Sequence, residues 1–130
     1  MNRIEYEERK RVYTHAIDRY GIKPQMLMVI EEMSELTKAI CKFFRCPSYV
    51  EPDEGLIDAI AEETADVTIM LEQLLLILGI NDNVCEHMDE KIVRLADRLG
   101  MKEPRQRPLM EKEKEELEAL ERLRNVGKRE

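Results

Sequence analysis

The chain has 130 residues, which is enough for one domain with a modest apolar core and too few for a second. Five glycines, five prolines, two phenylalanines and no tryptophan favour helices over sheets, so the composition predicts an all-α fold. A net charge of −7 argues against a general nucleic-acid-binding surface, because duplex binding needs clustered Lys and Arg.

The N-terminus and the cysteines indicate the compartment. The opening segment MNRIEYEERK has no apolar stretch of the signal-peptide type, and the longest apolar run, 69–80, contains Glu72 and Gln73 and is too short to span a membrane. Three cysteines, an odd number without a secretory signal, fit a reducing compartment better than a disulfide framework. We therefore expect a cytoplasmic protein that binds neither nucleic acid nor membrane.

The first half of the chain predicts two helices. One runs from about residue 5 to 20, with Val12, Ala16 and Tyr20 on one side, and stops at Gly21. The next runs from about 24 to 44, because Pro24 suits a first turn, and its apolar stripe has 4-3-4-3 spacing. The stripe consists of Val29, Met33, Leu36, Ile40 and Phe43. Residues 45–54 read as a loop.

The second half predicts two further main helices and a tail. A helix over 55–78 carries the stripe Ile60, Thr64, Val67, Leu71, Leu74 and Leu78 and ends at Gly79. Its second half is apolar on more than one side, so we expect a partner subunit to cover it. The next, over about 82–99, turns Val84, Met88, Ile92, Leu95 and Leu99 inward. Residues 1–100 thus form a helical domain, and 101–130 form a linker and a charged helical tail.

The most informative feature is a repeat between the second and third predicted helices. The segment IEEMSEL at 30–36 has the same pattern as AEETADV at 61–67. This offset of 31 residues superposes Glu32 on Glu63 and Glu35 on Asp66, and it superposes the apolar stripes as well. The acids and the predicted core face therefore repeat together.

The repeat predicts a metal site. At about 100° per residue, both acids of each pair share one side of their helix, and the first acid borders the core, where an unpaired carboxylate is costly. If the helices pack antiparallel, all four carboxylates converge: Glu32, Glu35, Glu63 and Asp66. Magnesium prefers such oxygen ligands and leaves positions for water or phosphate. One E-x-x-E alone is usually a solvated helix face, so the prediction depends on both pairs.

At these residues the sequence resembles the MazG-like, all-α nucleoside triphosphate pyrophosphohydrolase superfamily. The family motif is E-x-x-E, a loop, then E-x-x-D, and here it reads EMSE at 32–35 and ETAD at 63–66. The segment from Tyr20 to Arg45 is similar to the small phage and bacterial branch of the superfamily. The resemblance covers roughly residues 10–99.

The resemblance implies a fold, a reaction and a cofactor. The fold is a helical bundle completed by subunit association, as a homodimer or homotetramer. The reaction is cleavage of an NTP or dNTP between the α and β phosphates, giving the monophosphate and pyrophosphate, with Mg²⁺ held by the four acids. Relatives carry K-x-x-x-N-x-x-[KR] on the following helix, which reads Lys91, Leu95 and Arg98 here, without the asparagine. Lys91, Arg94 and Arg98 remain phosphate-binding candidates, whereas sugar discrimination does not carry over.

Other charged residues on the same two predicted helices are candidates either for the site or for the solvent-exposed surface. Glu31 and Glu62 precede the proposed ligands and either orient or deprotonate the attacking water or face solvent. Lys42 is a further substrate-binding candidate, while Lys38 points away from the predicted core and reads as a surface lysine.

Four alternatives to the hydrolase are considered, the last of them a di-iron bundle. The first is a nucleotide-binding or helical interaction module of the same fold without activity, and the second is a purely structural bundle with solvated acids. The third is a zinc site, but the spacings of Cys41, Cys46, Cys85 and His87 do not match structural zinc sites. Neither histidine has the Glu-x-x-His pairing that a di-iron bundle needs.

Overall fold

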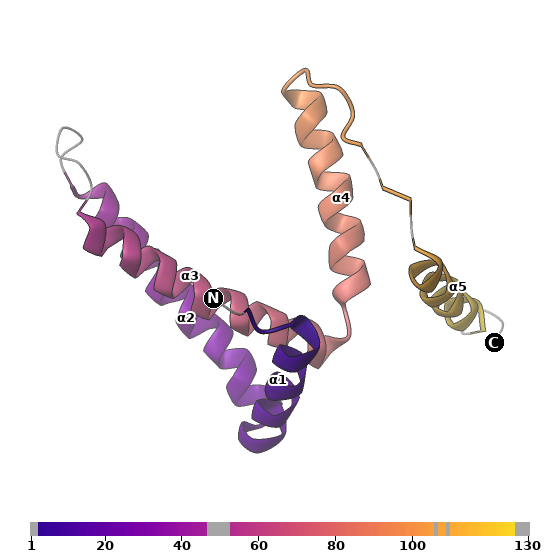
Figure 1. Ribbon diagram of the computed structural model, residues 1–130, viewed down its shortest axis with the longest axis horizontal. Helices are drawn as coiled ribbons and strands as arrows, with labels where there is room; N and C mark the ends of the chain where they lie inside the picture. Colours follow the sequence, from indigo (N-terminus) through magenta and orange to yellow (C-terminus); the bar gives the residue numbers. More distant parts are fainter. Residues whose placement is uncertain (1–2, 47–52, 106, 109, 127–130) are drawn as a thin grey trace. The chain divides into compact units, whose positions relative to one another are not determined.

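The computed structural model describes residues 3–46, 53–105, 107–108 and 110–126, apart from the side chains of residues 120, 124 and 126. Within these residues the secondary structure is all helical, which confirms the prediction of an all-α chain (Figure 1). The described helices are α1 Tyr6–Tyr20, α2 Ile22–Phe44, α3 Glu54–Leu78, α4 Asn81–Arg98 and α5 Glu111–Val126. The chain divides into two compact units, Met1–Cys85 and Glu86–Glu130.

The helix boundaries follow local chemistry. Helix α2 begins before Pro24, because a proline in the first turn removes only an N–H that has no partner within the helix. At the start of α3, the Asp53 side chain accepts a hydrogen bond from the Gly55 backbone N–H at 3.1 Å. The predicted loop 45–54 falls mostly on residues 47–52, which lie outside the described residues.

Two glycines end helices where the sequence predicted stops. Gly79 follows α3 with φ 61° and ψ 35°, a left-handed conformation that L residues with a side chain adopt at a cost. Gly21, with φ 95°, joins α1 to α2 in one residue. A glycine at each position ends one helix and allows the next to begin within a very short turn.

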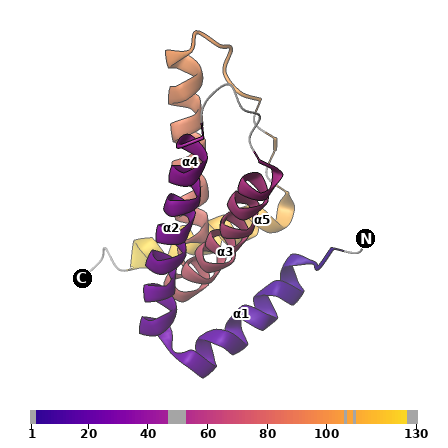
Figure 2. The same ribbon diagram turned by 90° about the vertical axis from the view of Figure 1, so that its left-hand side faces the viewer.

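Helices α2 and α3 pack side by side in antiparallel directions (Figure 2). Gln25, near the start of α2, lies opposite Gln73, near the end of α3, and the two buried side chains share a hydrogen bond from Nε2 of Gln25 to Oε1 of Gln73 at 2.8 Å. Because both amides are buried, each needs the other as a partner. This pair fixes the register of the two helices at one end.

The face that α2 turns towards α3 differs from the predicted stripe. Met33 and Ile40 were expected in the core but are 51% and 37% exposed. The residues one position earlier, Glu32 and Ala39, lie in the contact instead. The packed face of α2 therefore consists of Gln25, Val29, Glu32, Leu36, Ala39 and Phe43.

The packed face of α3 is shifted in the same way. Thr64, Leu71 and Leu78 of the predicted stripe are exposed, whereas Met70 is buried. Both helices are apolar over more than one side, so the spacing alone does not select which apolar side packs. The two rotations keep the offset of 31 residues, since Ala39 corresponds to Met70. As a result, Glu32 and Glu63 lie within the α2–α3 contact and not at its border.

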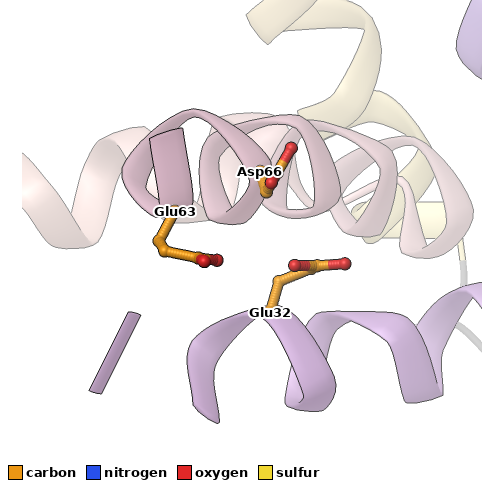
Figure 3. Close-up of side chains that lie close together, drawn as sticks. All are labelled: Glu32, Glu63 and Asp66. Carbon is orange, nitrogen blue, oxygen red and sulfur yellow. The ribbon is translucent and has the colours of Figure 1, made fainter. Parts of the chain in front are cut away.

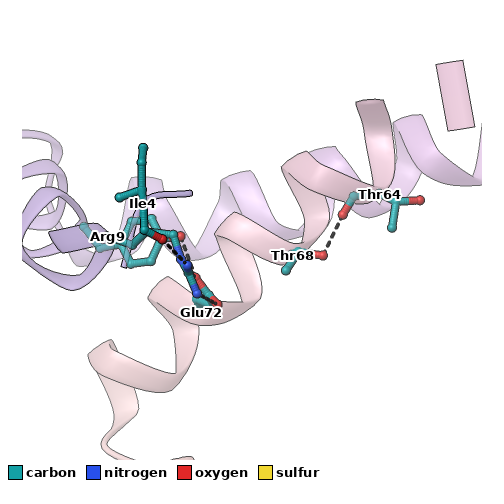
Figure 4. Close-up of polar contacts among 6 residues, drawn as sticks. Ile4, Arg9, Thr64, Thr68 and Glu72 are labelled. Carbon is teal, nitrogen blue, oxygen red and sulfur yellow. Dashed lines mark hydrogen bonds and ion pairs between the residues drawn. The ribbon is translucent and has the colours of Figure 1, made fainter. Parts of the chain in front are cut away.

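Helix α1 is attached to α3 by a polar cluster (Figure 4). Arg9 donates to both carboxylate oxygens of Glu72, at 3.2 and 3.1 Å, and the Tyr13 hydroxyl donates to the same carboxylate. Tyr13 is buried, whereas Val12 and Tyr20, which the sequence analysis placed on one side of this helix, are 56% and 61% exposed. Tyr13 therefore marks the buried side of α1.

The second unit contains most of α4 and all of α5. On α4 the predicted inward residues Met88, Ile92, Leu95 and Leu99 are exposed, and Ala96 is buried. At the start of α5, Glu113 accepts hydrogen bonds from Arg107 and from the Met110 backbone N–H, which caps the first turn. Among the described helices, none is long and apolar enough to cross a bilayer.

Candidate metal centre

Three of the four predicted acids meet in the contact between α2 and α3. Glu32 projects from α2, Glu63 and Asp66 project from α3, and their carboxylates point towards one another (Figure 3). Each side chain offers an oxygen within 4.8 Å of an oxygen of the others, and all three are half-buried. Oxygens this close from two elements form a donor set suited to one hard cation. We call Glu32, Glu63 and Asp66 the acid cluster.

The position of Glu32 in the helix contact changes its acidity. The pKa of Glu32 is raised from its ordinary value, first because burial disfavours the charged form. Neighbouring negative charges raise the pKa of Glu32 further; in order of effect they are Asp66, Glu31, Glu63 and Glu35. Burial and repulsion act in the same direction, so the cluster holds negative charge that a cation would compensate.

The fourth predicted acid, Glu35, does not belong to the acid cluster. Its carboxylate pairs with Lys38 on the next turn of α2, with a distance of 2.6 Å between Nζ and Oε1. The expected convergence of four carboxylates is therefore found for three. The physical reason is local: a lysine three residues further along the same helix lies within reach of the carboxylate. The i,i+3 spacing of Glu35 and Lys38 is visible in the sequence and could have predicted the pair.

The other candidates on α2 and α3 are exposed. Glu31 is exposed, yet its charge contributes to the raised pKa of Glu32. Glu62 and Lys42 are also exposed. The structure thus places Glu31 beside the acid cluster electrostatically, while Glu62 and Lys42 face solvent.

The three basic candidates lie on α4, in the second unit. Lys91, Arg94 and Arg98 are all exposed, and Arg94 pairs with Glu90 at 3.2 Å. Leu95, which stands where the family motif has asparagine, is 44% exposed on the same helix. The side chains of Lys91 and Arg98 project from α4 two turns apart.

The cysteines are free thiols. Cys41 and Cys85 are exposed and Cys46 is half-buried. Within the described residues, the group of side chains close enough to hold a metal ion is the acid cluster, and it includes neither cysteine nor histidine.

Comparisons with known proteins give no relative. No family model matches the chain, and the searches of curated proteins and of solved structures found no match.

Proposed function

We propose that this chain is a magnesium-dependent nucleoside triphosphate pyrophosphohydrolase of the MazG-like superfamily, acting as a homo-oligomeric helical bundle. The observation that supports the metal site is the convergence of Glu32, Glu63 and Asp66 between two helices. The motif resemblance at EMSE and ETAD supports the reaction. The substrate is an NTP or dNTP, and the products are its monophosphate and pyrophosphate.

The donor set fits Mg²⁺. Three carboxylate oxygens within 4.8 Å of one another supply hard ligands, and a magnesium ion needs only a few of these beside water and phosphate oxygens. The raised pKa of Glu32 reflects negative charge that a divalent ion would compensate. Glu32, Glu63 and Asp66 would hold the ion, and Glu35 becomes a fourth ligand if its pair with Lys38 opens.

In the proposed reaction, the metal ion and the residues of the chain have separate roles. When bound, Mg²⁺ would neutralise the polyphosphate and lower the pKa of a water for attack on phosphorus. Glu31, exposed beside the acid cluster, is the proposed acceptor of the proton from that water. Lys42 on α2 and the three basic residues of α4 are the proposed phosphate ligands: Lys91, Arg94 and Arg98.

A substrate panel tests this proposal. Purified protein with Mg²⁺ is incubated with ordinary and damaged nucleoside triphosphates, and the products are separated by chromatography. The proposal expects monophosphate and pyrophosphate from at least one substrate, and a loss of at least 100-fold in Glu32→Gln. Asp58→Asn, which removes an exposed acid from α3, should keep full activity. Diphosphate and inorganic phosphate, or no product across the panel, would contradict it.

A second candidate is a binding module of the same fold without catalytic activity. The engagement of Glu35 with Lys38 and the presence of Leu95 favour it, since each departs from the family pattern. Calorimetry distinguishes the two candidates: the module binds magnesium nucleotide without releasing pyrophosphate.

A further inference from the structure

Helix α2 carries a second apolar stripe, outside its contact with α3. The stripe contains Ile30, Met33, Thr37, Ile40 and Phe44, and we call it the outer face of α2. Its 3-4-3-4 spacing spans four turns, which is the spacing of a helix that packs against another helix. The four apolar side chains are 63%, 51%, 37% and 78% exposed, in chain order.

The hydroxyls on and beside this stripe do not oppose its burial. Thr37 donates to the Met33 carbonyl oxygen at 2.8 Å, and Ser34 donates to the Ile30 carbonyl oxygen at the same distance. Thr68 on α3 makes the same kind of bond to Thr64 (Figure 4). A polar group whose donor is already satisfied within its own helix costs little when a partner covers it. The outer face of α2 can therefore be buried against a partner without leaving these hydroxyl donors unpaired.

The size of the outer face fits a second protein surface. Four large side chains at these exposures present on the order of 500 Å² of apolar area, near the largest patch that a typical monomer exposes. Two such faces packed together would bury about 1,000 Å², which reaches the lower limit of a specific interface. A surface that is apolar from Ile30 to Phe44, with no charged residue in the stripe, is also complementary to itself.

We propose that the outer face of α2 packs against the same face of a second copy of this chain. The two α2 helices run antiparallel about a two-fold axis near Thr37, the middle of the stripe, so that each end of one stripe covers the opposite end of the other. This rests on the homo-oligomer included in the proposed function and specifies its interface. At about 100° per residue, Glu32 lies about 120° around α2 from the middle of this face, so the acid cluster stays clear of the partner.

Sedimentation of the full chain tests the interface. The wild type should have twice the monomer mass at micromolar concentration. The double variant Ile30→Gln, Ile40→Gln should weaken the association at least 10-fold and keep its helicity by circular dichroism. Val12→Gln replaces a residue on α1 that is 56% exposed, and it should leave the association unchanged.

Cross-linking tests the two-fold axis. With Cys41, Cys46 and Cys85 replaced by Ser, Thr37→Cys should give a disulfide-linked dimer under mild oxidation, because a residue near the axis meets its own copy. The matched control Lys38→Cys, one residue further around α2, should cross-link at least 10-fold more slowly.

A helical wild type that stays monomeric at 100 µM, as expected if the chain's own α4 covered the face, would overturn the proposal. A dimer whose association is not weakened by the double variant Ile30→Gln, Ile40→Gln would overturn it as well. Pyrophosphate release is a separate readout, so loss of the dimer alone does not bear on the hydrolase.

Discussion

The acid cluster concentrates negative charge in the contact between two helices. Glu32, Glu63 and Asp66 repel one another, and the burial that raises the pKa of Glu32 also weakens the screening of that repulsion by water. Without a cation, this arrangement destabilises the fold. Residues that serve a function often destabilise the fold in this way.

Asp66→Asn should therefore stabilise the metal-free protein while removing activity. Neutralising one of three close carboxylates relieves repulsion, so we expect a gain of about 0.5–1 kcal/mol in the free energy of unfolding. The measurement is urea denaturation in the presence of a chelator. The control Asp58→Asn should change the stability by less than about 0.5 kcal/mol. A destabilised Asp66→Asn protein would mean that the carboxylates do not repel as the geometry implies.

Gln25 and Gln73 form the other polar contact between α2 and α3. Gln73→Ala should destabilise the protein by about 1–3 kcal/mol, because the buried Gln25 amide loses its partner. The double variant Gln25→Leu, Gln73→Leu should recover most of that loss, since no polar group is then left unpaired. Thermal unfolding of the three proteins measures both effects. Equal losses in the single and double variants would show that the amides matter only for packing.

Much of the candidate site could be predicted at the residue scale. The offset of 31 residues predicted which acids correspond, and three of the four meet. The offset is independent of side-chain conformation, so it survives the rotation of both helices. The exception is Glu35. Its carboxylate forms an ion pair with Lys38 on the same helix, and this pair competes with convergence across the two helices.

At the scale of elements, the polar cluster between α1 and α3 is centred on a single carboxylate, that of Glu72. The pKa of Glu72 is lowered, first by the hydrogen bonds from Arg9 and then by the one from Tyr13, while burial opposes them. The same contacts raise the pKa of Arg9, and burial together with Glu72 raises that of Tyr13. The charged form of Glu72 thus stabilises the contact between α1 and α3.

The contribution of Glu72 should depend on pH. Because its pKa is lower in the folded chain than in the unfolded one, the stabilisation is fully present above the unfolded value of 4.5 and is lost as pH falls through the folded value. Wild type should exceed Glu72→Gln in unfolding free energy at pH 7, and the difference should shrink between pH 4.5 and pH 3. Denaturant unfolding at several pH values measures it. A difference that stays constant down to pH 3 would contradict the assignment to the ionised carboxylate.

The elements themselves were easier to predict than their packed faces. Gly21 and Gly79 have the positive φ that stops a helix, so their positions delimit α1 and α3 directly. By contrast, α2 and α3 carry enough apolar residues for two stripes, and spacing alone favoured Met33 and Ile40 over Glu32 and Ala39. The small Ala39 is buried in the packed face of α2, and Glu32 of the acid cluster lies in the same face. Periodicity predicts that the segment is helical, but it does not predict which of two apolar sides packs against the neighbouring helix.

At the scale of the whole molecule, the candidate residues fall into two units, each described by itself. The acid cluster belongs to Met1–Cys85, and the basic candidates of α4 belong to Glu86–Glu130. The sequence predicts one helical domain over 1–100 and a tail beyond it, and this remains a prediction; the boundary between the compact units falls within α4. The proposed metal ligands all belong to the first unit, so metal binding can be measured without substrate.

A magnesium titration followed by calorimetry, on the wild type and on Asp66→Asn, tests the central claim most directly. We predict one saturable binding event per chain in the wild type, at least 10-fold weaker in Asp66→Asn and unchanged in Asp58→Asn. A wild type that shows no binding at millimolar Mg²⁺, or an Asp66→Asn protein that binds as tightly as the wild type, would contradict a metal site at the acid cluster.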